Sequence, residues 1–544
     1  MKTRYRDITR FLAGCTYGAA KAVMVAAALM LSACDKYLDE LPDNRTSLDS
    51  DANITELLTN AYPQGSYFML TELYSDNTDH CIGSQSYTAF NNSGTTLHQE
   101  ASTWKDITDK NQDSPYQIWE SCYKSIAAAN NVLIAIAERG NPPRLNPQRG
   151  EALLCRAYCH FVLGNVFCMP YSSKTCNQTM GITYMRSTET TVSPVYSRGT
   201  MAELYANIAA DIEAGLPLID DNIYSVPKYH FNKKAAQAFA ARFYLYYMQD
   251  DKSNLDKCIS YASQALTSTP SDMMRDWTAL GKLSAGSAQY NAFIDASSKA
   301  NLLIISASSY WTWVYGPTAV GKGYCHNTKL SDTETINSTG FWGSKDNILM
   351  KPTQVSGSPR ITHYKMGQYV EYTDIVNGKG YPRMIIPAFT TDALILDRAE
   401  AYALKGDYTN AYQDLTTWMN AFTKNKGTVT ASQLATNYGS NKAYYTPTSP
   451  TVKKRLNPDF TVTAGEQENL IHAVLHARRV ATLHEGLRWF DVKRYGIEIY
   501  RRNVDGILGD GNISVYDTMT KEDPRRAIQL PQYVISAGIT ANPR

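Results

Sequence analysis

The stretch Asp392 to Phe422, DALILDRAEAYALKGDYTNAYQDLTTWMNAF, has the pattern of two amphipathic helices joined by a tight turn. The small residues Ala399, Ala401 and Ala411 flank the turn and would let the two helices approach closely. Gly406 can take the left-handed conformation that ends a helix, and Asp407 is placed to cap the helix that follows. The segment therefore predicts an antiparallel helical hairpin.

Similar helices recur through the rest of the chain. Apolar residues at helical spacing predict helices over 114–140, 147–167, 200–215, 233–248 and 255–266. The turn chemistry of residues 405–408 is that of a tetratricopeptide-like pair, but the pairs are irregularly spaced. We expect a mainly α fold built from degenerate tetratricopeptide-like helix pairs, and a generic helical bundle is the alternative.

Two regions between the helices have a different composition. Gly, Pro, Ser, Thr and Asn dominate from about residue 270 to 387 and again at 426–465, with short β-like runs at 302–306 and 348–351. Long loops in a folded protein are usually functional. We predict a helical region over 34–270, a loop-rich insertion over 271–387 that forms the ligand face, and a C-terminal helical region over 388–544 with a loop at 426–465.

The N-terminus has the layout of an export signal. Lys2, Arg4, Arg6, Arg10 and Lys21 precede an apolar run of about ten residues, which is too short to span a bilayer. The run closes on Leu-Ser-Ala-Cys, the bacterial lipoprotein signature, so residues 1–33 are expected to be removed and Cys34 to be acylated. Acyl chains would then tether the protein to a membrane. A plain signal with a chance cysteine is the alternative.

The mature chain is nearly neutral and rich in tyrosine. Loss of five basic and one acidic residue with the signal leaves 48 basic and 50 acidic side chains, a net charge of −2. Such a balance has no electrostatic footprint for nucleic acid. The 38 tyrosines, against 14 phenylalanines, favour recognition surfaces that are partly wet.

The eight cysteines that follow Cys34 are scattered singly, with no CxxC pair for a zinc or redox motif. We interpret most of them as small buried hydrophobes. A disulfide between Cys168 and Cys176, across the turn at 170–177, is the alternative for that pair.

Enzyme-like patterns are incomplete. Residues 316–323 imitate a phosphate loop but lack the Ser or Thr that binds magnesium, and His472 with His476 lacks the glutamate of a HExxH metalloprotease. Paired carboxylates for glycoside hydrolysis need only meet in space, and nothing in the sequence marks a pair. We therefore predict no catalytic residues, no metal site and no cofactor.

The strongest candidate for binding is an aromatic run within the loop-rich insertion. If residues 310–315 are extended, Trp311, Trp313 and Tyr315 face one side at intervals of about 6.6 Å. That row is suited to successive sugar rings or to apolar peptide side chains, and the alternative is an aromatic strand packed on the scaffold. Further candidates lie beside this row or in other turn-rich segments, namely Tyr310, Trp342, Tyr87 and Trp104.

The C-terminal segment 477–496, ARRVATLHEGLRWFDVKRYG, resembles the signature of the SusD/RagB family. Residues 34–39 with Pro42, the segments 152–171 and 392–408, and the ending around 530–532 and 542–543 match as well. The resemblance implies a surface lipoprotein of the Bacteroidetes outer membrane that faces outward. It also implies a SusC-like TonB-dependent transporter as partner.

The resemblance has one visible departure, because family members commonly carry glutamates where this chain has Ala477 and Ala481. The charged residues after them are retained. On spacing, Glu485, Arg488 and Asp491 can form a ladder of ion pairs one helical turn apart. We expect Glu485, Arg488, Trp489, Asp491 and Arg494 to lock the last helix pair rather than to catalyse a reaction.

The sequence thus predicts a surface lipoprotein that binds an oligosaccharide, or another oligomeric nutrient such as a peptide, and delivers it to the transporter. A lipid-anchored glycan-degrading enzyme is the alternative.

Overall fold

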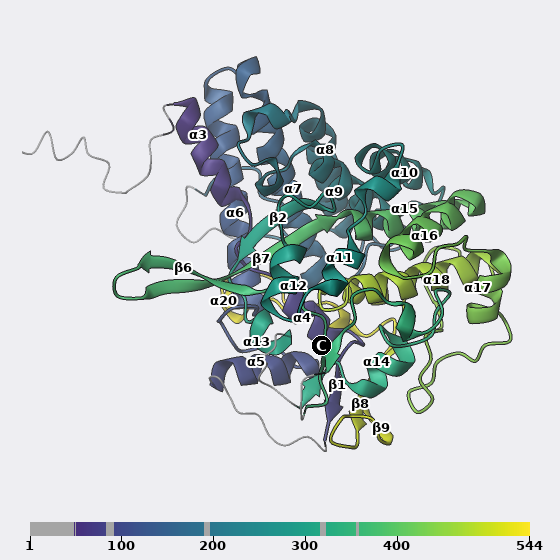
Figure 1. The fold of residues 1–544 in the computed structure, drawn as a ribbon. Helices are drawn as coiled ribbons and strands as arrows, with labels where there is room; N and C mark the ends of the chain where they lie inside the picture. Colours follow the sequence, from purple (N-terminus) through teal and green to yellow (C-terminus); the bar gives the residue numbers. More distant parts are fainter. Residues whose placement is uncertain (1–47, 49, 83–91, 190–195, 316–322, 355–357) are drawn as a thin grey trace, which may run out of the picture. The chain divides into compact units, whose positions relative to one another are not determined.

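Paired helices are the main regular element of the structure (Figure 1). The computed structural model describes all residues except 1–47, 49, 83–91, 190–195, 316–322 and 355–357. Residues 55–544 form one compact unit. The predicted mainly α fold is confirmed. The long helices are α6 (Pro115–Glu138), α7 (Asn146–Phe167), α8 (Met201–Gly215), α9 (Lys233–Tyr246), α10 (Ser253–Leu266), α15 (Thr391–Lys405), α16 (Tyr408–Phe422) and α18 (Glu466–Ala481).

The predicted hairpin at 392–422 is formed by α15 and α16. Gly406 lies at a φ of 82°, and its N–H donates to the carbonyls of Tyr402 and Ala403 at the end of α15. The side chain of Asp407 accepts from the N–H of Asn410 at 3.2 Å and so caps α16. Helix α15 also packs on α10 and α18, which links the hairpin to the helix pairs on both sides.

Shorter helices join and cover these pairs. They are α3 (Asp51–Leu58), α4 (Phe68–Tyr74), α5 (Asn92–Ser102), α11 (Trp277–Lys282), α12 (Ser287–Phe293), α13 (Trp311–Tyr315), α14 (Thr328–Glu334), α17 (Ala431–Tyr438), α19 (Arg488–Arg494) and α20 (Gln532–Ser536). Within the described ranges, no helix is both long and apolar enough to cross a membrane.

The strands form three small sheets. One has the order β3-β1-β8-β9, a second β2-β7-β6 and a third β4-β5. Their bounds are β1 (Asp79–Cys81), β2 (Asn301–Ala307), β3 (Tyr324–Cys325), β4 (Thr353–Gln354), β5 (Ile361–Thr362), β6 (Gln368–Asp374), β7 (Lys379–Thr390), β8 (Ile499–Val504) and β9 (Ile513–Met519).

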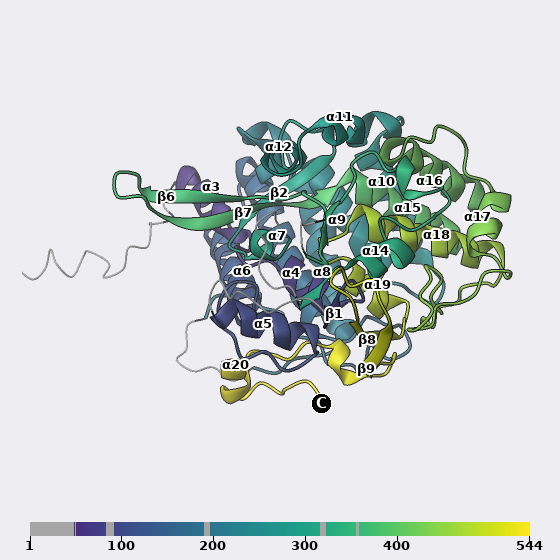
Figure 2. The same cartoon turned by 60° about the horizontal axis from the view of Figure 1, so that its bottom comes forward.

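The loop-rich insertion holds more regular structure than its composition predicts. The expected strand at 302–306 is present as β2. The expected strand at 348–351 is wrong, because only an isolated bridge joins Ile348 to Thr423. Strands β6 and β7 form a long antiparallel hairpin that extends away from the helices in both views (Figures 1 and 2).

All eight cysteines in the described part of the chain are buried and free. Cys168 and Cys176 are therefore not joined in this structure, and the interpretation of these residues as small core side chains is confirmed. The Sγ atoms of Cys81 and Cys325 lie 3.7 Å apart, between β1 and β3.

Candidate functional site

The aromatic run at 310–315 is not extended. Residues 311–315 form the short helix α13, and the N–H of Val314 donates to the carbonyl of Tyr310 at 3.3 Å. The prediction of an extended row is therefore wrong. In a helix, positions 311, 314 and 315 share one face, whereas 313 lies on the opposite side.

The face at 311, 314 and 315 is part of the core. Trp311 is completely buried, and its indole N–H donates to the carbonyl of His484 at 2.6 Å. Tyr315 is also buried, and its ring stacks on that of His484 with the centroids 4.3 Å apart. Neither ring has an exposed face on which a sugar could stack, so the alternative of aromatic residues packed on the scaffold holds for these two.

Tyr310 immediately precedes α13 and is half-buried. Its N–H donates to Asp113 Oδ2 at 2.6 Å, and the hydroxyl of Ser309 donates to Asp113 Oδ1 at 2.6 Å. Burial raises the pKa of Asp113 to about 7, against the effect of both hydrogen bonds. The backbone at the start of α13 is thus fixed, while the Tyr310 side chain is partly accessible.

The other aromatic candidates divide between core positions and residues outside the described part of the chain. Trp342 is completely buried against Trp418, with ring centroids 5.6 Å apart. Trp104 is buried beneath the guanidinium of Arg501, and its indole N–H donates to the carbonyl of Tyr74 at 2.9 Å. Tyr87 and the side chain of Trp313 lie outside the described residues, as do Cys34 and residues 316–322 of the imitation phosphate loop.

The charged residues of the C-terminal signature do not form the predicted ladder. Three of them pair with distant segments, and Asp491 pairs with Arg478 of the same signature. Glu485 pairs with Lys365 at 2.8 Å, Arg488 with Asp76 at 2.8 Å, Asp491 with Arg478 at 2.8 Å, and Arg494 with Glu400 at 2.9 Å. The one contact within the helix joins Arg494 to Asp491 at 3.9 Å. Trp489 between them is completely buried against Tyr74.

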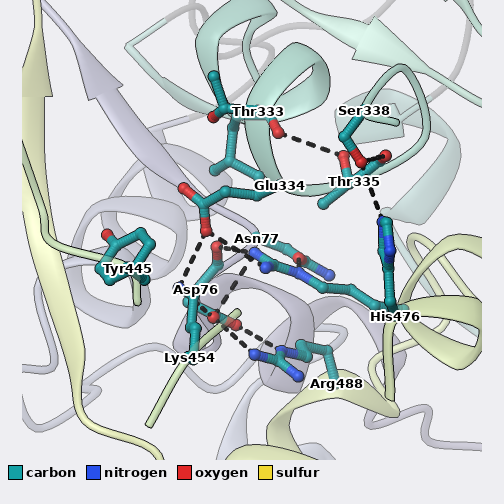
Figure 3. Close-up of polar contacts among 12 residues, drawn as sticks. Asp76, Asn77, Thr333, Glu334, Thr335, Ser338, Tyr445, Lys454, His476 and Arg488 are labelled. Carbon is teal, nitrogen blue, oxygen red and sulfur yellow. Dashed lines mark hydrogen bonds and ion pairs between the residues drawn. The ribbon is translucent and has the colours of Figure 1, made fainter. Parts of the chain in front are cut away.

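The centre of this arrangement is a buried charge cluster, which we define as Asp76, Asp79, Glu334, Lys454, Arg479, Arg488 and Arg502. Figure 3 shows part of it, with Asp76, Glu334, Lys454 and Arg488 labelled. Arg488 holds both carboxylate oxygens of Asp76, at 2.8 and 2.9 Å. Lys454 bridges Asp76 at 2.7 Å and Glu334 at 2.9 Å. Arg502 bridges Glu334 at 2.8 Å and Asp79 at 2.7 Å.

Electrostatics keeps the carboxylates of Asp76 and Glu334 ionised. Burial alone would raise the pKa of Asp76, but Arg479, Arg488 and Lys454 outweigh it and hold that pKa well below its ordinary value. Glu334 has a pKa of about 2, because Lys454, Arg502 and Arg479 likewise overcome the effect of burial. Carboxylates held in this way do not exchange protons near neutral pH.

The neighbouring histidines are also tied into the core. His476 contacts the hydroxyls of Ser338 and Tyr438, each at 2.9 Å, and burial lowers its pKa to about 3. Within the part of the chain that the structure describes, no group of three or more His, Cys, Asp or Glu is placed to hold a metal ion. The space between His476 and the buried charge cluster measures about 10 Å³, roughly enough for one water molecule.

Two larger hollows open elsewhere. One of about 290 Å³ is lined by Trp119, Tyr123 and Tyr196 together with both apolar and polar side chains. The other, of about 350 Å³, combines the rings of Tyr171 and Phe460 with several hydroxyls and the Asp459–Lys521 ion pair. Aromatic faces beside hydrogen-bonding groups suit polyhydroxylated ligands.

Solved structures share this fold over almost the whole chain. A SusD superfamily protein of Bacteroides vulgatus is 18% identical, with a TM-score of 0.59, and the match covers 92% of this chain and 99% of that one. A SusD superfamily protein of Bacteroides thetaiotaomicron is 16% identical, with a TM-score of 0.59, and covers 90% and 98%. A SusD-like carbohydrate-binding protein of Bacteroides vulgatus is 15% identical, with a TM-score of 0.53, and covers 84% of each chain. No curated protein sequence matches.

One family model matches the N-terminal part of the sequence. Residues 36–245 match the family model SusD-like, described as starch-binding and associating with the outer membrane. These residues are similar to the SusD-like family. The SusD-like fold places the C-terminal signature in the interior, where its charges meet residues of α4, α14 and α15 and of the segments between the helices.

Sequence reasoning missed most partners of that signature. Asp76, Glu334, Lys454 and Glu400 come from segments up to 412 positions away, which spacing along one helix cannot reveal. One signal was available: Glu400 stands between Ala399 and Ala401 on a helix whose surface is almost entirely buried. A charge at such a position needs a buried partner.

Proposed function

We propose that this protein is a nutrient-binding lipoprotein of the outer membrane that captures an oligosaccharide and passes it to a SusC-like TonB-dependent transporter. The observation that carries the proposal is the match of residues 36–245 to a family described as starch-binding and associating with the outer membrane. The printed description of one structural neighbour as carbohydrate-binding supports it. Peptide is the second ligand class that the proposal allows.

The attachment to the membrane is proposed from the sequence. Leu31-Ser32-Ala33 precedes Cys34 after an apolar run, which is the pattern at which bacterial lipoproteins are cleaved and acylated. The mature N-terminus would then carry the acyl chains, and the folded unit would face outward over the transporter.

The ligand contacts are proposed at the accessible face of α13. Trp311 and Tyr315 occupy the buried face, so position 313 lies on the remaining side of the helix, and the half-buried Tyr310 immediately precedes it. We assign ligand contact to Tyr310, Trp313 and Tyr87, and a structural role to Trp311, Tyr315, Trp342 and Trp104. The family's nutrient-binding role needs no catalytic residue, and the protein is proposed to bind without cleaving.

Binding of malto-oligosaccharides, other glycan oligomers and peptides by titration calorimetry tests this assignment. Replacing Trp313 or Tyr310 by Ala should weaken binding of the true ligand at least about tenfold, equal to roughly 1.4 kcal/mol, with little change in Tm. Trp311→Ala is the matched control. Because Trp311 is buried, its loss should lower Tm strongly.

Two results would contradict the proposal. Full affinity in both Tyr310→Ala and Trp313→Ala would remove the site from α13, and Phe460→Ala would then test the 350 Å³ hollow. Shortening of the oligosaccharide during incubation with purified protein would favour a glycan-degrading enzyme instead.

The anchor has its own test. Cys34→Ala should move the protein from the membrane fraction to the soluble fraction, because the acylated residue is lost. Mass spectrometry of the mature wild-type N-terminus should find acyl chains on Cys34. An unmodified N-terminus would contradict the proposed lipid anchor and would leave the proposal of ligand binding unaffected.

A further inference from the structure

The hairpin of β6 and β7 exposes more apolar surface than any fold requirement explains. Strand β2 pairs with β7 only as far as Met384, so residues 368–383 continue as a two-stranded ribbon. At its tip, Ile375 is 81% exposed and Val376 is 94% exposed. Exposed apolar groups that cluster in this way mark interaction sites.

The turn at the tip does not need these two side chains. Asp374 accepts hydrogen bonds from the backbone N–H of Asn377 at 3.1 Å and from its side chain at 2.6 Å. Gly378 follows at a φ of 63°, and its N–H donates to the carbonyl of Ile375 at 3.3 Å. Polar residues thus build the turn, and any residues would serve at positions 375 and 376 as far as folding is concerned.

Tyrosines surround the stem behind the tip on both faces. Tyr369 lies opposite Arg383 and Tyr381 opposite Glu371, which places both tyrosines on one face of the ribbon. Val370 and Tyr372 alternate with them and occupy the other face. The charges are balanced, since Arg383 pairs with Glu371 at 2.7 Å and Lys379 lies opposite Asp374. A neutral, two-faced belt of tyrosine behind an apolar tip suits insertion into a surface that surrounds it.

The base of the hairpin lies near the N-terminal end of the unit formed by residues 55–544. Arg383 donates to the side-chain oxygen of Gln64 at 3.3 Å, and Gly65 forms a bridge with Ser308 at the end of β2. Cys34 precedes Thr55 by 21 positions, and 21 residues span at most about 75 Å when extended. A chain tethered at Cys34 would therefore hold the hairpin within reach of the same membrane.

We propose that the tip of the β6–β7 hairpin, Ile375 and Val376, inserts into the lipid surface that carries the acyl anchor, with Tyr369, Tyr372 and Tyr381 at the headgroup level. The inference rests on the proposed anchoring at Cys34 for its setting. Tyrosine is suited to the headgroup region because its ring is apolar and its hydroxyl is polar. A second contact beside an acyl chain strengthens membrane attachment and limits how the body can tilt.

A membrane fits the observations better than a protein partner. A protein groove would cover one face of the ribbon and leave the tyrosines of the other face exposed, whereas a lipid surface takes both faces at once. The hairpin also offers no net charge for a complementary protein surface to recognise.

The experiment uses the full chain with Cys34→Ser, which removes the acylated residue, and vesicles of phosphatidylcholine with and without lipopolysaccharide. The parent should sediment with vesicles, and Ile375→Ser with Val376→Ser should reduce the bound fraction at a given lipid concentration at least about tenfold. The matched control is Ile507→Ser with Leu508→Ser, an exposed apolar pair in the β8–β9 turn, which should change binding less than about twofold.

The depth to which the tip enters the lipid gives a second readout of insertion. Val376→Trp should add fluorescence that brominated phosphatidylcholine quenches, and Ile507→Trp should add fluorescence that it does not. Absence of vesicle binding by the parent, equal binding by tip and control variants, or an unquenched indole at 376 would each overturn the proposal. If the tip variants bind vesicles normally yet fail to associate with a transporter, a protein partner is the occupant. Glycan affinity, measured on the same proteins, reports separately on the proposed function.

Discussion

The buried charge cluster and the β6–β7 hairpin reverse the usual distribution of residues. Beneath α18 and α19, seven charged side chains lie inside the protein, and each is within pairing distance of at least one other. On the hairpin, aliphatic and aromatic side chains lie in solvent. The contrast separates two roles, because each buried charge is satisfied by contacts within this chain, whereas the exposed apolar groups have none of comparable extent.

The cluster contributes specificity of packing more than net stability. Removing charges from water costs several kcal/mol each, and pairing recovers that cost only when the geometry is good. Arg479 illustrates this demand, since it donates to Asn77 at 2.8 Å, to the carbonyl of Asp76 at 2.7 Å and to Glu334 at 3.2 Å. These contacts fix one arrangement of segments that are far apart in the chain.

Removing one charge from the buried charge cluster should have the largest effect on stability. Asp76→Asn leaves Arg488 and Lys454 buried beside a neutral amide, so the free energy of unfolding should fall by about 3 to 5 kcal/mol. Urea denaturation followed by circular dichroism measures this. Asp346→Asn is the matched control: its pair with Lys351 is largely exposed, so the loss should stay below about 1 kcal/mol. Equal losses in the two variants would show that the cluster is not a buried ion network.

Acid should weaken the interior while leaving the hairpin unaffected. Burial lowers the pKa of His98, His160 and His476 to about 3, whereas an unfolded histidine has a pKa of about 6.5. The unfolded chain therefore binds protons that the folded chain does not. Stability is complete above about pH 6.5 and falls progressively as the pH decreases toward 3.

His476→Gln tests one part of that dependence. Each histidine adds up to about 1.4 kcal/mol per pH unit to the slope of stability against pH, so the slope between pH 6 and 4 should decrease by about that amount. Denaturation curves across this pH range give the slope. An unchanged slope would mean that His476 is protonated in the folded protein.

The sequence predicts the helices well because their signals are local. The apolar periodicity of 146–167 and the Gly406-Asp407 turn each depend on residues within a few positions. The run at 310–315 misleads for the opposite reason. Its aromatic and β-branched residues favour a strand, but the contacts of Tyr310 with Asp113 and of Trp311 with His484 set a helical turn. Those partners lie 197 and 173 positions away.

Distant partners also explain why the ion pairs of the C-terminal signature could not be predicted. Its spacing predicts pairs among Glu485, Arg488 and Asp491, which is wrong, and only the folded chain shows that Arg488 pairs with Asp76 and Arg494 with Glu400. The hairpin tip was missed because Ile375 and Val376 stand between polar turn residues and follow no periodic pattern. Exposure, which only the structure supplies, makes them conspicuous.

The smallest expected effect on the free energy of unfolding is that of changes at the hairpin tip. Ile375→Ser with Val376→Ser should change the free energy of unfolding by less than about 0.5 kcal/mol, because the two side chains bury almost nothing in the folded protein. Urea denaturation of the unacylated chain provides the measurement, with Asp76→Asn as the variant that must respond. A loss above about 1 kcal/mol would mean that the tip packs on the body of the protein in solution, and the hairpin would then belong to the fold rather than to an interaction surface.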